Sequence, residues 1–180
     1  VDITSGIKNW TLSVLDSNGT AVWEKSGSDV PAPRSYNGVN NAGSKVEDGE
    51  YTASLTVLYD NGNKPSAETK PFVIDTQKPQ AELSVNYDVF SPDGDKEKDR
   101  LVISNETSRE NRWNGKIVDA GGSEVMTFTW RGTPPEEVTW NGRNEAGKLV
   151  DDGKYKYVLS STDKAGNTAN YETAAFEKKT

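Results

Sequence analysis

Short segments in which apolar and polar residues alternate are the dominant pattern of this chain. In residues 51–57 every second position, beginning with Tyr51, is apolar, and Thr or Ser fills the positions between. Tyr155, Tyr157 and Leu159 repeat the alternation. A period of two is typical of a strand with one buried face. We find no helical period of ten residues or more, so the pattern predicts a chain built of strands.

Turn signals separate these segments. Residues 10–15 and 20–23 flank an Asp-Ser-Asn-Gly turn, and residues 116–118 and 124–128 flank Asp-Ala-Gly-Gly. Both patterns predict β-hairpins. Further strands are expected at 69–74, 81–85 and 170–176. Many short strands with a turn every 8–12 residues or so favour antiparallel β-sandwiches of the Ig-like or fibronectin-III-like kind.

One phrase of sixteen residues occurs twice, with Trp140 standing 104 positions after Tyr36. The first copy reads YNGVNNAGSKVEDGEY and the second WNGRNEAGKLVDDGKY. Outside this motif Trp10 aligns with Trp113 and Leu55 with Leu159. A period near 100 residues matches a whole domain with its own core. The repeat therefore predicts two homologous domains in tandem.

The two predicted domains are residues 1–77 and 78–180, with the boundary at the polar stretch that ends in Pro79. The second copy has a leading segment, with the expected strand at 81–85, before Trp113. The first copy has only nine residues before Trp10 and lacks a counterpart of residues 80–99. A leading strand of the first domain is therefore expected to be missing, or this domain closes its sheet differently.

Residues kept at the same place in both copies are expected to determine the fold. Glycines after Asn and after Asp suit turns with positive φ. The tyrosine that ends the motif could form a tyrosine corner, its hydroxyl bonding back to the connecting backbone. The acidic pairs Glu47-Asp48 and Asp151-Asp152 are far better explained by turns than by paired-carboxylate catalysis. The residues assigned to this structural motif are Tyr36, Gly38, Gly43, Asp48, Gly49, Tyr51, Trp140, Gly142, Gly147, Asp152, Gly153 and Tyr155.

Composition narrows the classes of function. The net charge is −7, which disfavours nucleic acid and anionic membrane surfaces as partners. No apolar stretch is long enough to span a bilayer, so no membrane insertion is expected. The chain has no Cys and no His, which excludes thiol catalysis, serine–histidine triads and Cys/His zinc sites. We therefore expect no catalytic residues and no required cofactor.

One acidic loop is a candidate for binding Ca²⁺. Asp93, Asp95, Glu97 and Asp99 occupy alternate positions, with Gly94 easing the turn. Closely spaced carboxylates are ligands that Ca²⁺ prefers, although the spacing is not that of an EF-hand. The competing interpretation is a solvated loop in which neighbouring Lys and Arg residues neutralise the carboxylates.

Two tryptophans, Trp23 and Trp130, are candidates for binding a glycan or a partner peptide. Both lie on or just after hairpin strands. An exposed aromatic ring could stack on a sugar, whereas packing within or between sheets is the commoner role in small sandwiches.

The repeated phrase resembles the Ig-like domain of flagellar hook-capping proteins (FlgD-type), a module that recurs in secreted and surface proteins of bacteria. The segment FSPDGDKEKD at 90–99 resembles a phrase, Phe-Ser-Pro-Asn-Gly-Asp-Gly-x-x-Asp, that opens related bacterial extracellular Ig-like domains. This chain departs from the two phrases at Tyr36, Asp93 and Lys96, where the family patterns have Trp, Asn and Gly. The Lys96 change bears directly on the geometry of the loop and on any ion site built on it.

The resemblance implies a non-catalytic spacer or interaction module of a larger bacterial cell-envelope or secreted protein, located outside the cytoplasm. Neighbouring domains of the same chain and a protein or glycan ligand are the expected partners. The alternatives are a carbohydrate- or protein-binding module and the accessory domains of a modular extracellular enzyme. Calcium bound at the acidic loop would stiffen such a spacer or interaction module.

Overall fold

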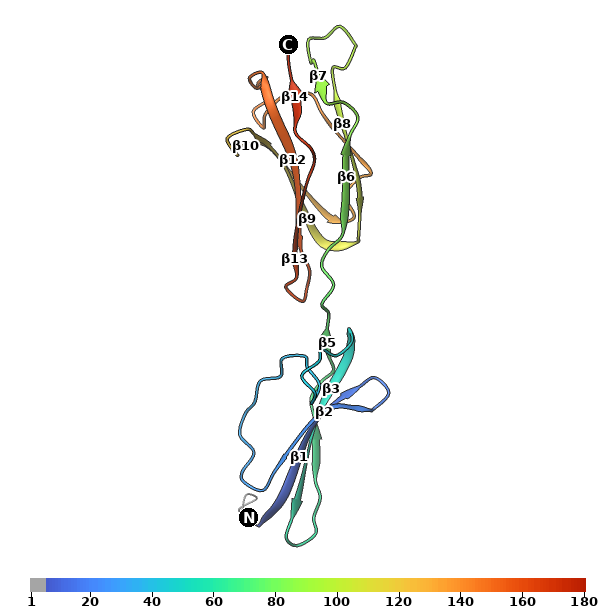
Figure 1. The fold of residues 1–180 in the computed structure, drawn as a ribbon, viewed down its shortest axis with the longest axis vertical. Coiled ribbons are helices and arrows are strands. Elements are labelled where there is room, and N and C mark those ends of the chain that lie inside the picture. Colours follow the sequence, from blue (N-terminus) through green and yellow to red (C-terminus); the bar gives the residue numbers. More distant parts are fainter. Residues whose placement is uncertain (1–5) are drawn as a thin grey trace. The chain divides into compact units, whose positions relative to one another are not determined.

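The computed structural model describes residues 6–180, and every regular element in that range is a β-strand (Figure 1). The strands are β1 (Ile7–Asp16), β2 (Ala21–Gly27), β3 (Gly49–Tyr59), β4 (Ser66–Glu68), β5 (Phe72–Ile74), β6 (Ala81–Val85), β7 (Val89–Phe90), β8 (Leu101–Thr107), β9 (Glu110–Asp119), β10 (Glu124–Gly132), β11 (Glu137–Trp140), β12 (Gly153–Thr162), β13 (Thr168–Glu172) and β14 (Phe176–Lys178). The prediction of an all-β chain with antiparallel sheets is confirmed. Residues 6–180 contain no helix with the length and apolarity needed to cross a membrane.

The chain divides into two compact units, Val1–Thr76 and Gln77–Thr180, called unit 1 and unit 2 below. Unit 2 is a sandwich of two layers (Figure 1). One sheet has the order β10-β9-β12-β14-β7, with β13 also pairing with β12, and the other has the order β11-β8-β6. Strand β7 runs parallel to β14, and the other pairs are antiparallel.

The core of unit 2 lies between these layers because each strand turns its alternate apolar residues inward. Trp113 and Ile117 of β9 and Tyr157 of β12 are buried on one side, opposite Leu101 and Ile103 of β8. Phe90, Trp140, Tyr155 and Phe176 form an aromatic cluster, with ring centroids 5.3–6.4 Å apart. Large rings supply most of the apolar area that this small unit can bury.

Unit 1 contains one sheet within residues 6–76, in the order β2-β1-β3-β4 with β5 also pairing with β3. Its registry repeats that of unit 2, since Trp10 faces Val57 and Leu12 faces Leu55 across β1 and β3. Residues 28–48 connect β2 to β3 without forming a strand. Unit 1 therefore repeats the larger sheet of unit 2, and within its described residues no second sheet covers it.

Two predicted strands are shorter than the sequence suggested. The segment 69–74 forms only β5, because Pro71 cannot donate to a ladder. The segment 170–176 divides into the end of β13 and the start of β14. Thr173 lies between them, where its backbone N–H donates to Tyr157 O and its side-chain oxygen accepts from Tyr157 N. The chain thereby shifts along β12 from one paired segment to the next.

Candidate functional site

The repeated motif contains a turn that an Asn side chain holds in the same way in both units. In unit 1, Asn40 Oδ1 accepts hydrogen bonds from the backbone N–H groups of Ala42 and Ser44, both at 3.0 Å. In unit 2, Asn144 Oδ1 does the same for Ala146 and Lys148, at 3.1 and 3.0 Å. An Asn side chain that mimics the backbone in this way holds a tight turn.

The glycines of the motif fall into two groups. Gly38, Gly43, Gly142 and Gly147 have φ between 71° and 81°, a conformation in which a side chain would be strained. Gly49 and Gly153 instead begin β3 and β12. Positive φ is the wrong explanation for Gly49, which lies outside the left-handed region.

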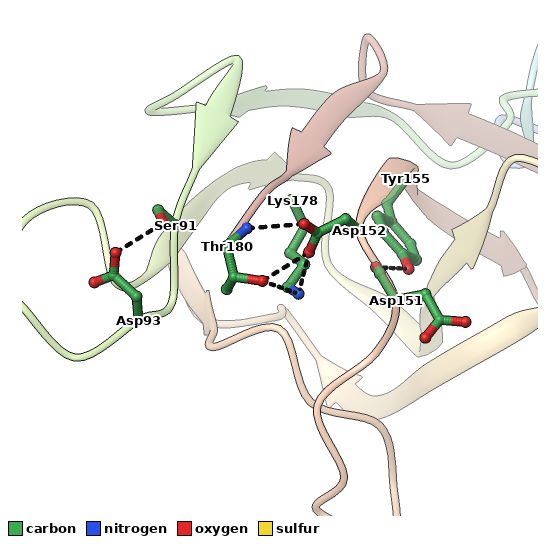
Figure 2. Close-up of polar contacts among 7 residues, drawn as sticks. All are labelled: Ser91, Asp93, Asp151, Asp152, Tyr155, Lys178 and Thr180. Carbon is green, nitrogen blue, oxygen red and sulfur yellow. Dashed lines mark hydrogen bonds and ion pairs between the residues drawn. The ribbon is translucent and has the colours of Figure 1, made fainter.

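The tyrosines that end the motif bond back to the chain that leads into their strand. Tyr51 Oη donates to the Glu47 carbonyl oxygen at 2.6 Å, and Tyr155 Oη donates to the Asp151 carbonyl oxygen at 2.7 Å (Figure 2). Burial, followed by nearby carboxylates, raises the pKa of both hydroxyls. They therefore remain protonated donors at neutral pH.

The aspartates of the motif bind the segment that follows the last strand of each unit. Asp48 Oδ1 accepts from the backbone N–H and the hydroxyl of Thr76, both at 2.9 Å. Asp152 Oδ2 accepts from Thr180 N at 3.1 Å, and its Oδ1 accepts from Thr180 Oγ1 at 2.9 Å. Thr180 stands 104 positions after Thr76, so this contact belongs to the repeat. The turn interpretation of these aspartates was incomplete, because they also hold a strand end.

In unit 2 a buried lysine also binds the aspartate. Lys178 is 1% exposed, and its Nζ lies 2.6 Å from Asp152 Oδ1 and 3.3 Å from Thr180 Oγ1 (Figure 2). Hydrogen bonds from Lys178 and Thr180 lower the pKa of Asp152 to about 2. A carboxylate that stays ionised at neutral pH cannot act there as a general acid. Donors from Lys178 and Thr180 occupy both carboxylate oxygens of Asp152, so the role that the structure shows for it is to hold the strand end.

Sequence reasoning missed Lys178 and Thr180. Lysine is rarely buried without a partner, so Lys178 looks like a surface residue of a terminal strand. A signal was nevertheless available, because Lys178 is two residues after Phe176 and aligns with the apolar Ile74 of the first copy. An inward position that carries Lys requires an acceptor, and Asp152 at the start of the neighbouring strand provides it.

At the start of the motif, the aromatic position has different surroundings in the two units. Trp140 is 2% exposed, and its Nε1 donates to the Arg143 carbonyl oxygen at 2.8 Å. Tyr36, its counterpart, has a buried hydroxyl without a hydrogen-bond partner among residues 6–180. Burial raises the pKa of this Tyr36 hydroxyl.

The acidic loop between β7 and β8 brings three of its four candidate residues together. One carboxylate oxygen from each of Asp93, Asp95 and Asp99 lies within 4.8 Å of the others. Glu97 is exposed and does not belong to this group. The prediction of a four-carboxylate cluster is therefore reduced to three residues.

The loop's own amides bind these carboxylates. Asp99 accepts from Gly94 N at 2.7 Å and from Lys96 N at 2.9 Å, and Asp95 Oδ1 accepts from Glu97 N at 2.7 Å. Lys96 has a φ of 76°, a conformation that Gly adopts without strain. The Gly that the related phrase has at this position therefore suits the backbone of the loop. Lys96, which stands where the family phrase has Gly, keeps the turn but holds the backbone in a strained conformation. Calcium binding here stays a prediction.

The two candidate tryptophans are half-buried. Trp130 stacks on Phe128 with centroids 5.4 Å apart and an interplanar angle of 7°. Trp23 packs at a tilt against Tyr36, with centroids 5.8 Å apart. Both rings therefore have an intramolecular role, and a role in binding remains a prediction.

Comparison with known proteins identifies the second half of the chain. The family model described as "CHU_C Type IX secretion signal domain" matches residues 84–173, which lie inside unit 2 and make up half of the sequence. No curated protein matches the sequence significantly. The resemblance to flagellar hook-capping domains is not tested by this match and stays a prediction.

Several solved structures resemble the chain at low sequence identity. A tetra-tandem repeat from the extending region of a large adhesion protein shares 18% identity with a TM-score of 0.39, covering 94% of this chain and 41% of that one. A 1.5-MDa bacterial ice-binding adhesin shares 14% identity with a TM-score of 0.44, covering 96% and 53%. Dimeric latent PorU from Porphyromonas gingivalis shares 18% identity with a TM-score of 0.40, covering 75% and 12%. The chain thus spans less than half the length of the tetra-tandem repeat, and these likenesses say nothing about its function.

Proposed function

Because the chain belongs to the CHU_C type IX secretion signal domain family, we propose that unit 2 is the part recognised during secretion, and that unit 1 is a non-catalytic spacer joining it to the rest of a larger protein. The family places the protein outside the cytoplasm, and the matched domain is a signal, which is itself not catalytic. The observation that carries the proposal is the position of the match, which falls entirely within unit 2.

The construction of unit 2 supports a role as a preformed recognition module. Its core lies between two sheets. Asp152 binds Lys178 and Thr180, and these contacts hold β14 and the residues after it against β12. A surface held in one conformation loses little conformational entropy when a partner binds it. Unit 1 is built from the same motif without this closed core.

A reporter assay tests the proposal. The 180-residue chain is fused behind a fluorescent protein that carries an export signal, and the fusion is produced in a bacterium with a type IX secretion system. We expect the reporter on the cell surface or in the medium. The same fusion ending at Thr76 should stay inside the envelope, as should the complete fusion in a strain without the system. Equal release of the complete and shortened fusions would contradict the proposal.

A glycan- or protein-binding module and an accessory region of an extracellular enzyme remain the alternatives. Binding of the complete chain to a glycan array, lost in Trp23→Ala or Trp130→Ala, would favour the first. Since both rings pack against neighbouring aromatics, each variant must first be shown to melt cooperatively.

A further inference from the structure

The apolar face of the unit 1 sheet is open. We use the name open face for the side chains of Leu12, Val14, Trp23, Ala53 and Leu55, which point to the same side of β1, β2 and β3. Together with Pro31 and Tyr36 they line a hollow of about 400 Å³. Val14 is 2% exposed, whereas the other four side chains of the open face are only half-buried. An apolar sheet face that remains partly in water indicates a missing covering layer.

The same face in unit 2 is fully covered. Leu159 and Tyr157, the counterparts of Leu55 and Ala53, are each 0% exposed. They are covered by the sheet β11-β8-β6. Leu101 and Ile103 of β8, also fully buried, supply its inward side chains. The repeat therefore shows what kind of segment covers this face.

The backbone next to the open face is also unpaired. Residues 33–36 are the counterpart of β11, which pairs with β8 through Val138 opposite Ile103 and Trp140 opposite Leu101. In the described part of unit 1, residues 32–36 make no backbone hydrogen bond. The hydroxyl of Tyr36 is buried without a partner at the same place. A free strand edge beside an apolar groove is the arrangement that an added β-strand completes.

A second edge lacks its partner in the same way. Strand β14 pairs with β7 in unit 2, whereas β5, its counterpart in unit 1, pairs only with β3 within the described residues. Val73 in β5 is 68% exposed. Phe72 is half-buried, and Phe176 at the same position of unit 2 is 1% exposed. Both unpaired edges correspond to segments that bind β7 and β8 in unit 2.

We propose that the open face binds a β-segment of the same chemistry as β6 to β8, supplied by the larger protein on the N-terminal side of β1. This segment would place apolar side chains at alternate positions on the open face and pair its backbone with residues 33–36. The source follows from the repeat, because β6, β7 and β8 directly precede β9 in unit 2. The repeat register also extends before Trp10, since Thr4-Ser5 stands 103 positions before Thr107-Ser108.

An N-terminal graft onto the complete chain tests this. A copy of residues 79–103 is placed directly before Val1, which puts its β8 sequence at the same spacing from Trp10 as β8 has from Trp113. We expect hydrogen exchange at alternate amides within 34–36 to slow by at least about tenfold, since paired amides exchange only through opening. The fluorescence of Trp23 should shift to shorter wavelength as the groove closes.

The control graft carries Ser at the positions copied from Leu83, Val85, Leu101 and Ile103. It keeps the length and turns of the segment and removes its apolar face, so amides 34–36 should exchange as in the ungrafted chain. The unchanged amides of β9 and β12 in unit 2 serve as the reference for folding. No protection in the apolar graft, or equal protection in both grafts, overturns the proposal.

The ungrafted chain tests the competing occupant, which is a second copy of this chain. Sedimentation should give a monomer, with amides 34–36 exchanging rapidly. A dimer that dissociates on Leu55→Glu would show that another copy covers the open face, and would overturn the proposed source. None of these readouts depends on secretion, so they are independent of the proposed function of unit 2.

Discussion

At the scale of single residues, the internal repeat separates side chains that build the fold from those peculiar to one unit. Asp48 and Asp152 occupy one position of the motif and bind Thr76 and Thr180 in the same way. Lys178 has no such counterpart, since Ile74 stands at its place. Its burial beside Asp152 is thus an addition of unit 2, and its energetic role can be measured separately.

Substitution of the two partners should have opposite consequences. Asp152→Ala leaves the buried ammonium of Lys178 without its carboxylate, and we expect the thermal midpoint of unit 2 to fall by several degrees. Lys178→Met replaces the cation by an apolar side chain of similar length, which is often neutral or stabilising at buried ion pairs. Calorimetry of both variants checks this, and the double variant should lose less stability than Asp152→Ala because it leaves no buried ammonium without its carboxylate. A larger loss in Lys178→Met than in Asp152→Ala would contradict the explanation.

The same carboxylate predicts an acid-dependent loss of stability. The pKa of Asp152 in the folded chain is about 2, below its ordinary value of 3.8. A group whose folded pKa is depressed stabilises the fold above the unfolded pKa, and this contribution disappears as pH falls through the folded pKa. Urea denaturation of unit 2 should therefore show a loss between about pH 4 and pH 2 that is smaller in Asp152→Asn. Parallel pH profiles for the two proteins would exclude this role.

The acidic loop gives a third prediction at this scale. If Asp93, Asp95 and Asp99 bind Ca²⁺ with the affinity of extracellular modules, about 5 mM Ca²⁺ should stabilise unit 2 by roughly 1–2 kcal/mol relative to a chelator. The increase should be absent in Asp95→Ala, while Glu97→Ala should retain it because Glu97 lies outside the cluster. Identical melts with Ca²⁺ and with chelator would mean that the loop amides alone satisfy the carboxylates.

Sequence reasoning succeeded where a residue acts through its own chain neighbours. The asparagine turns and the bonds from Tyr51 and Tyr155 span four residues or fewer, so local spacing predicts them. The contact between Asp152 and Lys178 spans 26 residues and joins two strands. Its register depends on how β12 and β14 pair, which no local pattern determines.

At the scale of elements, β9 contains a glycine that the packing of its neighbours requires. A Cβ built on Gly115 would lie 2.7 Å from Tyr157 Oη and 2.8 Å from Trp130 Cζ3. In unit 1 the equivalent position is Leu12, which lies in the open face. Alternation predicts an apolar side chain at this inward position, whereas the rings of Trp130 and Tyr157 on the two neighbouring strands occupy the space that it would need.

Gly115→Ala should therefore destabilise unit 2 although alanine is favoured over glycine in a strand. Overpacking of a closed core costs about 1–3 kcal/mol, and we expect a loss in that range from chemical denaturation. Asn111→Ala, at an exposed position of the same strand, is the matched control and should change stability by less than about 0.5 kcal/mol. A stabilising Gly115→Ala would show that Trp130 and Tyr157 move aside easily.

At the scale of the whole molecule, the same sequence motif occurs in two units that differ in how far their central sheet is covered by a second sheet. The repeat predicts two domains of one fold, and each unit contains the same central pairing of strands. The comparison of the two copies predicts that unit 1 lacks a leading strand or closes its sheet differently, and its described residues form a single sheet. The pattern of β1 and β3 alone does not show this, because it is the same whether or not a second sheet lies against them. The buried aromatic and aliphatic cluster lies in unit 2.

This difference predicts that unit 1 opens far more readily than unit 2. In unit 1 the fully buried apolar side chains of residues 6–76 are Trp10, Val14 and Tyr51, and the strand-free connection 28–48 lies beside the open face. Regions with little buried apolar area and few backbone hydrogen bonds open first. Brief digestion with a protease of broad specificity should cut within residues 28–48 before any site in unit 2, leaving a resistant product that contains residues 77–180.

The N-terminal graft of residues 79–103 should delay this cleavage, and its serine control should not. Early cleavage within β9 or β12 would instead show that closure by two sheets does not determine which unit is stable.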